Sequence, residues 1–141
     1  MDVIRLLGIR ETPLSVDEVL AAVRDHAAGG TALFLGTVRE QDHGKQVTAL
    51  SYSSHPTAEA ELRQVAEKVA ADFPVTAVAA VHRVGDLALG DIAVIVAVAA
   101  PHRDEAFKAA RRLIDDLKAR VPIWKHQTFA DGETEWVGAG E

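Results

Sequence analysis

The 141-residue sequence contains no cysteine. This absence excludes disulfide bonds, thiolate nucleophiles, iron–sulfur ligation and any storage of sulfur as a persulfide on the chain itself. If the protein takes part in sulfur chemistry, another molecule must bring the sulfur.

Long apolar runs and an excess of positive charge are also missing. No apolar run approaches the roughly 20 residues that span a bilayer, and the N-terminus lacks the pattern of a signal peptide, so we expect a cytoplasmic protein with no membrane partner. The formal net charge of −6 argues against general nucleic-acid binding, although a local basic patch can still bind a small anion.

Several motifs of known chemistry are absent as well. The sequence has no H-E-x-x-H and no Cys/His spacing typical of a metal site, so no metal is expected. It has no G-x-x-x-x-G-K-[ST] or G-x-G-x-x-G after a strand, which leaves nucleotide-binding folds without support. We therefore predict no bound cofactor.

The composition is that of a globular protein. Hydrophobic residues make up 48% of the chain and charged residues 26%, and the length suits one domain, expected to span residues 1–141. Three stretches show apolar residues at helical spacing. The first follows a capping box of Ser15 and Glu18 and is expected to end at Gly29 and Gly30. The predicted helices cover residues 16–28, 62–73 and 101–121.

Extended segments separate these helices. The turn residues Asp42, His43 and Gly44 predict a hairpin between the strands before and after them, and Asp131 with Gly132 predicts a second hairpin near the end of the chain. The strand at 31–38 is a continuous apolar run and is expected to be buried. The predicted strands cover residues 31–38, 47–52, 75–84, 91–100, 123–129 and 134–137. Hairpin-linked neighbours favour an α+β fold with mainly antiparallel sheet.

Two lysines flank the end of the third predicted helix. The residue before a proline is disfavoured in the helical region, so Val121 and Pro122 end the helix and begin an extended segment. Lys118 therefore lies in the last helical turn, where the helix dipole alone favours a cation. Lys125 lies beyond the break, where no such structural reason applies. This makes the end of the helix a candidate functional site.

The start of the same helix carries His102 and Arg103. A guanidinium at the positive end of a helix dipole is unfavourable unless an anion binds there, and free backbone N–H groups, an arginine and an imidazole are the parts of an anion site. Asp104 could instead satisfy Arg103 locally. Arg39, at the end of a predicted strand, adds a further basic side chain of the kind that loops present to ligands. The pair at 82–83, His-Arg, is expected to be a structural pair at a sheet edge.

Four stretches together carry a family resemblance. They lie at residues 34–39 (Phe-Leu-Gly-Thr-Val-Arg), 82–85 (His-Arg-Val-Gly), 101–107 (Pro-His-Arg-Asp-Glu-Ala-Phe) and 117–125 (Leu-Lys-Ala-Arg-Val-Pro-Ile-Trp-Lys). Their order and spacing resemble the large, catalytic subunit of molybdopterin synthase, the MoaE family. The resemblance implies an α/β hammerhead fold and a homodimer of large subunits, which forms the core of a heterotetramer with one small ubiquitin-like subunit at each end.

The resemblance also implies a sulfur transfer. In that family the small subunit carries a thiocarboxylate on a C-terminal Gly-Gly tail, which enters a pocket of the large subunit and delivers sulfur to cyclic pyranopterin monophosphate; two deliveries form the dithiolene of molybdopterin. By position in the shared motifs, Lys118 and Lys125 correspond to the catalytic lysines. The implied substrate-binding residues are Arg39, His102, Arg103 and Phe34.

The chain departs from the family pattern at two places. Ser53 follows Tyr52 where a glutamate is common, and Gln127 stands where many members have an acidic residue. A glutamine cannot act as a general base, so the sequence leaves no proton-transfer role for position 127. Two other functions remain open at this point: a non-catalytic module that holds a phosphorylated metabolite, and an enzyme in which one lysine forms a Schiff base with a carbonyl substrate.

Overall fold

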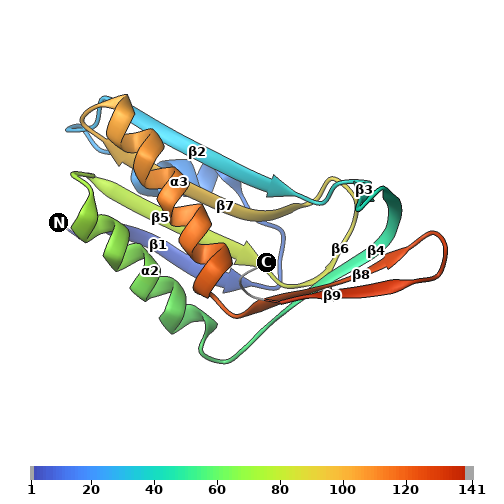
Figure 1. The fold of residues 1–141 in the computed structure, drawn as a ribbon. Helices are drawn as coiled ribbons and strands as arrows, with labels where there is room; N and C mark the ends of the chain where they lie inside the picture. The colour runs from blue at the N-terminus through green and yellow to red at the C-terminus, as the bar shows by residue number, and fades with distance from the viewer. Residues whose placement is uncertain (1, 139–141) are drawn as a thin grey trace.

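The computed structural model describes residues 2–138, which form two β-sheets and three α-helices (Figure 1). The helices are α1 (Val16–Val23), α2 (Ala58–Asp72) and α3 (Arg103–Arg120). The strands are β1 (Ile4–Arg10), β2 (Gly30–Thr37), β3 (Gln41–Asp42), β4 (Lys45–Ser54), β5 (Ala77–Arg83), β6 (Gly85–Leu87), β7 (Ile92–Ala100), β8 (Ile123–Phe129) and β9 (Thr134–Val137). None of the helices in this range has both the length and the apolar character needed to cross a membrane. Residues 1 and 139–141 of the predicted domain lie outside the described range.

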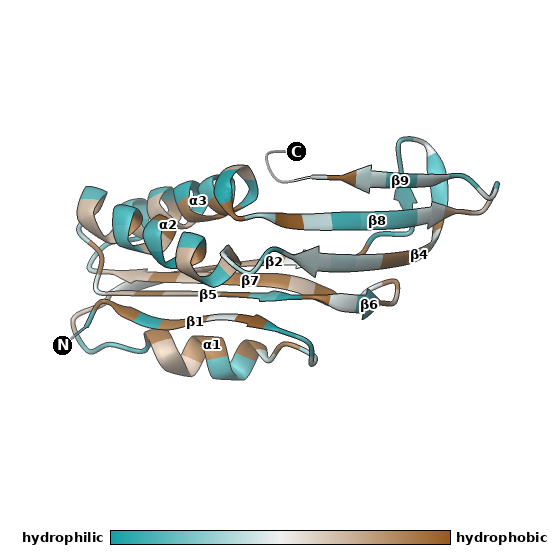
Figure 2. Ribbon diagram, turned by 90° about the horizontal axis from the view of Figure 1, so that it is seen from below, coloured by the Kyte–Doolittle hydropathy of each residue, from teal (hydrophilic) through white to brown (hydrophobic). Residues whose placement is uncertain are grey.

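The first sheet has the strand order β1-β5-β7-β2, with α2 and α3 on one face and α1 on the other (Figure 2). Side chains of β5 and β7 alternate between two cores: Val78 and Val96 pack under α2 and α3, whereas Val81 and Ile95 pack against α1. A strand with both faces covered can be apolar at every position. This explains the uninterrupted apolar run that β7 shows in the sequence.

The second sheet projects from the first. It has the order β3-β4-β8-β9. Strand β6 also pairs with β4, at residues 50–52, whereas β3 pairs with residues 45 and 46 of β4. Only β1 and β5 pair in parallel; the other strand pairs are antiparallel in the range that the structure describes. The predicted α+β hammerhead fold with mainly antiparallel sheet is confirmed.

The hairpin predicted at Asp42, His43 and Gly44 has a different partner from the one expected. The turn joins β4 to the two-residue strand β3, whereas β2 pairs with β7 of the other sheet. His43 and Gly44 both have positive φ, at 54° and 75°, as a two-residue hairpin of type I′ requires. A local turn pattern thus predicted the turn but not the sheet to which the preceding strand belongs.

The strand β2 is not buried, contrary to the prediction. It forms an edge of the first sheet, and Leu33, Phe34 and Leu35 are 38–40% exposed. Its inward-facing Ala32 alone joins the core under α2 and α3. The apolar run therefore reflects a surface of apolar side chains rather than a strand covered on both faces.

Two further differences concern the N-terminal third. Helix α1 ends at Val23, well before the two glycines that were expected to end it. Gly29 and Gly30 instead allow the start of β2 to pass close to the start of α3: a Cβ on Gly29 would lie 2.4 Å from the carbonyl oxygen of Pro101. Strand β1 has no counterpart among the predicted elements.

Candidate active site

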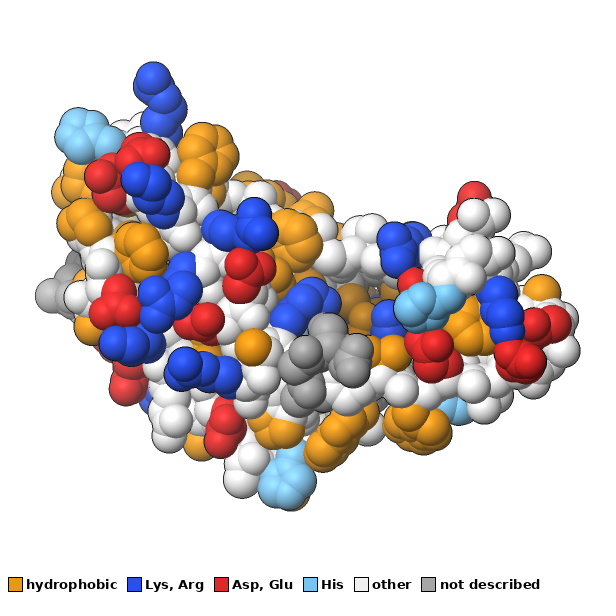
Figure 3. All heavy atoms as spheres, viewed as in Figure 1, with side chains coloured by type: hydrophobic (Ala, Val, Ile, Leu, Met, Phe, Trp, Pro, Cys, Tyr) orange, Lys and Arg blue, Asp and Glu red, His pale blue; other side chains and the backbone are white. Residues whose placement is uncertain are grey.

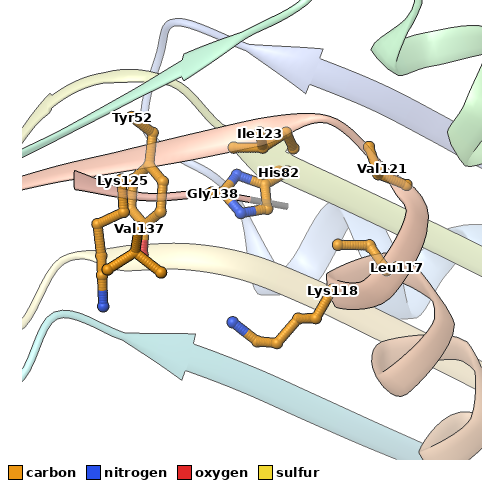
Figure 4. Close-up of a pocket in the computed structure, with 9 residues that line it drawn as sticks. All are labelled: Tyr52, His82, Leu117, Lys118, Val121, Ile123, Lys125, Val137 and Gly138. Carbon is orange, nitrogen blue, oxygen red and sulfur yellow. The ribbon is translucent and has the colours of Figure 1, made fainter. Parts of the chain in front are cut away.

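A small pocket lies where α3 ends and the two sheets meet. It consists of two adjoining cavities of about 70 and 130 Å³. Lys and Arg side chains gather in the hollow between the two parts of the molecule (Figure 3). Both cavities share the side chains of Tyr52, His82, Lys118 and Lys125. The two lysines that the sequence singled out thus meet in one site (Figure 4).

The end of α3 and the start of β8 place these lysines. The last helical hydrogen bond joins the amide of Val121 to the carbonyl of Leu117, and the chain then passes through Pro122 into β8, as predicted. In β8, Lys125 pairs across the ladder with Tyr52 of β4 and with Val137 of β9. The terminal nitrogens of both lysines are directed toward the same space (Figure 4).

Lys118 is the less stabilised of the two positive charges. The residue as a whole is exposed, but its side chain runs along the pocket wall and loses part of its contact with water. This desolvation lowers the pKa of the Lys118 amine, and the nearby charge of Lys125 lowers it further. Within residues 2–138, Lys118 forms no ion pair. Its neutral form is therefore more accessible than that of an ordinary surface lysine.

Lys125 has a carboxylate neighbour. Asp42 is almost buried, and its Oδ2 lies 3.7 Å from the Lys125 Nζ, while its Oδ1 accepts a hydrogen bond of 2.8 Å from Arg39. The hydrogen bond from Gln127 is the largest influence on the pKa of Asp42; burial, the next largest, opposes it, and the hydrogen bond from Arg39 lowers the pKa further, so that it is about 2. Asp42 is thus a carboxylate at every physiological pH.

Gln127 connects this carboxylate to a second one. Its side chain is fully buried, and its Nε2 donates to Asp42 Oδ2 at 2.6 Å and to Glu135 Oε1 at 3.0 Å. His43 lies 3.2 Å from the same oxygen of Glu135. The sequence had only excluded a proton-transfer role for Gln127; the structure shows that its amide joins β3, β8 and β9 beside Lys125.

The cluster of Asp42, His43 and Glu135 also has ligand atoms close enough to suit a cation, all within 4.8 Å of one another. Both oxygens of Asp42, however, already face donors, namely Arg39 on one side and Gln127 on the other. Further positive charge so close to Arg39 and Lys125 would be repelled. The geometry is that of a hydrogen-bonded network of side chains.

His82 was expected to be a structural residue at a sheet edge, but it lies in an interior strand and forms part of the pocket wall. It is 4% exposed, and its Nδ1 lies 2.7 Å from the carbonyl oxygen of Arg83, which fixes Nδ1 as the protonated nitrogen. Burial, opposed by that hydrogen bond and aided by the charge of Lys118, lowers the pKa of His82 to about 4. The ring is therefore neutral, with the lone pair on Nε2. Tyr52 packs against it edge-on at 4.9 Å between ring centroids.

Arg39 lines the larger cavity, and its side chain is 76% exposed at the pocket mouth. Phe34 does not line either cavity. Its ring lies beside Gly36, where an added Cβ would come within 3.5 Å of the ring and 2.6 Å of Val94. Phe34 thus belongs to the exposed face of β2 that leads toward the pocket.

His102 and Arg103 lie at the other end of α3. His102 is the N-cap residue, with no side-chain capping bond, and Arg103 is the first helical residue. Fifteen residues separate Arg103 from Lys118, roughly 22 Å along a helix axis. Asp104 pairs with Lys108 rather than with Arg103. Within one chain, therefore, these two residues cannot contact a small ligand bound between the lysines.

The fold and the pocket define an α+β protein with a small cationic cavity suited to an anionic ligand. The chain belongs to the family described as MoaE protein, which matches residues 9–120. It is 44% identical over 131 residues to the molybdopterin synthase catalytic subunit 1 of Mycobacterium tuberculosis, covering 92% of this chain and 88% of that protein. It is 38% identical over 129 residues to the human molybdopterin synthase catalytic subunit, covering 91% and 68%.

A solved structure gives the same result for the fold. The molybdopterin synthase structure from Staphylococcus aureus superposes with a TM-score of 0.86 at 34% identity, covering 92% of this chain and 95% of the other. The predicted family is confirmed.

Proposed function

We propose that this chain is the catalytic subunit of a molybdopterin synthase, and that it transfers sulfur from a thiocarboxylate on a small partner protein to cyclic pyranopterin monophosphate. The observation that carries this proposal is the pairing of Lys118 and Lys125 in one pocket, with unequal surroundings, in a member of the MoaE family. Such a pair offers an amine whose positive charge is weakly stabilised and a second amine whose positive charge has a carboxylate neighbour.

Release of sulfur from a thiocarboxylate requires both. The thiocarboxylate sulfur first bonds to a carbon of the substrate in place of an oxygen, which gives a thioester. A nucleophile then adds to the acyl carbon and places negative charge on the carbonyl oxygen. Collapse of this intermediate breaks the bond between the acyl carbon and sulfur, so the sulfur stays on the substrate and the acyl group leaves on the nucleophile. A positively charged group near that oxygen stabilises the intermediate, an effect typically worth 10²–10³ in rate. A neutral amine in the same cavity can act as the nucleophile or accept its proton. The pocket supplies both groups without a metal or another cofactor being required by this chemistry.

The sulfur donor must be a partner with a thin, flexible end. The chain has no cysteine to carry sulfur, and the cavity beside Lys118 is only about 70 Å³. A terminal Gly-Gly segment suits it, because residues without side chains can enter a narrow space while their backbone groups are still recognised. The negative charge of a thiocarboxylate is attracted by Lys118, Lys125 and Arg39. The proposed partner is therefore a small ubiquitin-like sulfur carrier that ends in Gly-Gly.

A second copy of the chain completes the proposal. The edge strand β2 exposes Leu33, Phe34 and Leu35, and Phe107 near the start of α3 is 65% exposed; these are large apolar side chains that a monomer has no reason to present. This surface lies beside the start of α3, where His102 and Arg103 are exposed. Pairing of two copies there would cover the apolar side chains. It would also allow the phosphate-binding residues of one copy to serve a pocket of the other, which a single chain cannot do.

We further place this activity in the cytoplasm, with no membrane or nucleic-acid partner. The alternative of a non-catalytic module that binds a phosphorylated metabolite uses the same basic residues. It requires no particular protonation state of Lys118, and the partial desolvation of that amine favours catalysis.

The test is reconstitution of the reaction. The purified chain, a thiocarboxylated small subunit and cyclic pyranopterin monophosphate should together give the dithiolene product. Lys118→Ala and Lys125→Ala should each lower the rate by at least about 100-fold, with native circular dichroism because both side chains lie at or beyond a helix end. Lys68→Ala, which removes an exposed lysine paired with Asp72 on α2, is the matched control. Full activity of both pocket variants, or equal activity with inorganic sulfide in place of the partner, would refute the mechanism.

A further inference from the structure

The histidine of β5 presents one ring nitrogen to the pocket. We propose that Nε2 of His82 accepts a hydrogen bond from the last backbone N–H of the donor tail, the amide of its terminal glycine, and thereby holds the acyl carbon between the two lysines. This inference rests on the sulfur-transfer function proposed above and adds to it a residue that recognises the tail.

The orientation of the His82 ring is fixed from two sides. Nδ1 lies 2.7 Å from the carbonyl oxygen of Arg83, so it carries the proton and donates it to that bond. Tyr52 packs edge-on against the ring at 4.9 Å between ring centroids. Within residues 2–138, Nε2 forms no hydrogen bond, and it keeps contact with the cavity that the ring lines. A ring that is already held in place can bind a ligand with little further loss of conformational entropy.

A purely structural role would not require an imidazole at this position. His82 is 4% exposed, and the rest of β5 from Ala77 to Val81 is apolar and fully buried. An apolar ring would fill the same space without removing a second polar nitrogen from water. Buried polar atoms generally have a hydrogen-bond partner. The lone pair of Nε2 in the pocket wall therefore indicates that a ligand supplies the donor.

The wall on which His82 lies is common to both cavities of the pocket (Figure 4). The cavities of about 70 and 130 Å³ share His82 and Tyr52 with the two lysines, whereas Arg39 lines only the larger one. The larger cavity therefore suits the anionic substrate and the smaller one suits the tail. Sulfur passes from tail to substrate where the cavities join, so the acyl carbon must lie there. The peptide group next to that carbon then lies beside His82.

The smaller cavity offers few acceptors to a peptide group. While the lysines are charged, only Tyr52 and His82 can accept a hydrogen bond among its described side chains, and the hydroxyl of Tyr52 must also place a proton of its own. The pKa of His82, about 4, keeps the lone pair of Nε2 available at neutral pH. A backbone N–H that loses water without gaining an acceptor is costly. The other described residues that line this cavity are Leu117, Val121, Ile123, Val137 and Gly138.

An ester in the tail removes the proposed donor. Glycolic acid in place of the terminal glycine puts an oxygen where the amide N–H stands. Small subunits with the amide and with the ester, both ending in an ordinary carboxylate so that no sulfur is transferred, would be compared by calorimetry. We expect the wild-type chain to bind the ester form roughly tenfold more weakly, the scale of one hydrogen bond with a buried acceptor. Equal affinities would overturn the proposal, and this comparison needs no substitution in the chain.

His82→Phe completes the cycle, because it keeps an aromatic ring beside Tyr52 and removes the acceptor. This variant should bind the amide form roughly tenfold more weakly than the wild type does and should bind the amide and ester forms equally. His26→Phe, at an exposed histidine after α1, is the matched control and should keep the difference between the two forms. A loss in His82→Phe that is the same for both tails would show a structural role, and a loss confined to binding of cyclic pyranopterin monophosphate would place the donor on the substrate; either result overturns the proposal.

These measurements separate this inference from the function on which it rests. A chain that distinguishes the two tails through His82 but transfers no sulfur from a thiocarboxylated partner would count against the sulfur-transfer function alone. A chain that transfers sulfur and binds both tails equally would count against the role of His82 alone.

Discussion

Replacing Asp42 with asparagine should lower the free energy of unfolding by about 2 kcal/mol at pH 7. In the folded chain the pKa of Asp42 is about 2 instead of 3.8, chiefly because Gln127 and then Arg39 donate hydrogen bonds to its carboxylate. Each tenfold change in an acid constant corresponds to about 1.4 kcal/mol, so this difference is worth about 2 kcal/mol of stability. The Asp42 side chain is nearly buried, so solvent screens this contribution only weakly.

The pH dependence has a definite sign. A carboxyl group whose pKa is lower in the folded than in the unfolded chain stabilises the fold fully above the unfolded pKa and loses that contribution as the pH falls through the folded pKa. For Asp42 this window runs from near its ordinary pKa of 3.8 down to about 2. The difference between wild type and Asp42→Asn should therefore be constant near neutral pH and should shrink to roughly half by pH 3.

Urea unfolding followed by tryptophan fluorescence measures both effects, since Trp124 and Trp136 lie on the neighbouring strands β8 and β9. The free energies of unfolding of the wild type, Asp42→Asn and the control Asp131→Asn would be compared at pH 7 and pH 3. An equal dependence of these free energies on urea concentration in all three proteins would check that unfolding is two-state. The control removes an exposed carboxylate and should lose much less stability. A loss for Asp42→Asn that is the same at both pH values would show that packing, and not its charge, explains the effect.

Three further outcomes follow from the site. Lys118→Arg should slow sulfur transfer by at least about 100-fold, as much as Lys118→Ala, because a guanidinium does not deprotonate. Lys125→Arg should slow it less than about tenfold, because the positive charge is kept. Single-turnover rates of sulfur transfer distinguish the two variants. Leu33→Glu on the edge strand should convert a dimer into a monomer in analytical ultracentrifugation while circular dichroism stays native, and an unchanged dimer would place the interface elsewhere. Arg103→Ala should weaken binding of the phosphorylated substrate roughly ten- to hundredfold in calorimetry and leave binding of the small subunit unchanged; equal losses would indicate a structural role.

The sequence predicted those parts of the fold that short-range patterns determine. Proline after Val121 ended α3 where expected, and the hairpin around Gly132 formed between β8 and β9. The errors concern which strands meet. The turn at His43 was recognised, but β2, the strand predicted to enter that hairpin, pairs with β7 some sixty residues further along the chain, and no local pattern encodes that choice. The exposure of Leu33 was also missed, because an apolar run looks the same on a covered strand and on an edge.

The candidate site shows the same division. Lys118, Lys125 and Arg39 were found from their motifs, and the structure brings all three to one pocket. Asp42 and Gln127 were not recognised as partners because 85 residues separate them, and their side chains meet only after β4 and β8 have paired. His82 had the residue type of a catalytic group but no sequence feature that showed its burial.

The anion-binding pocket contains one carboxylate, and its position leaves the charge of one amine weakly stabilised. Basic side chains attract the substrate and the donor tail, but if every amine were protonated, none could accept a proton or attack a carbonyl carbon. His82 does not resolve this, since its pKa of about 4 leaves it a weak base at neutral pH. A carboxylate placed equally between Lys118 and Lys125 would stabilise both charges. Asp42 lies on the side of Lys125 and Arg39, so the cavity stays attractive to anions while Lys118 remains the amine whose charge is least stabilised.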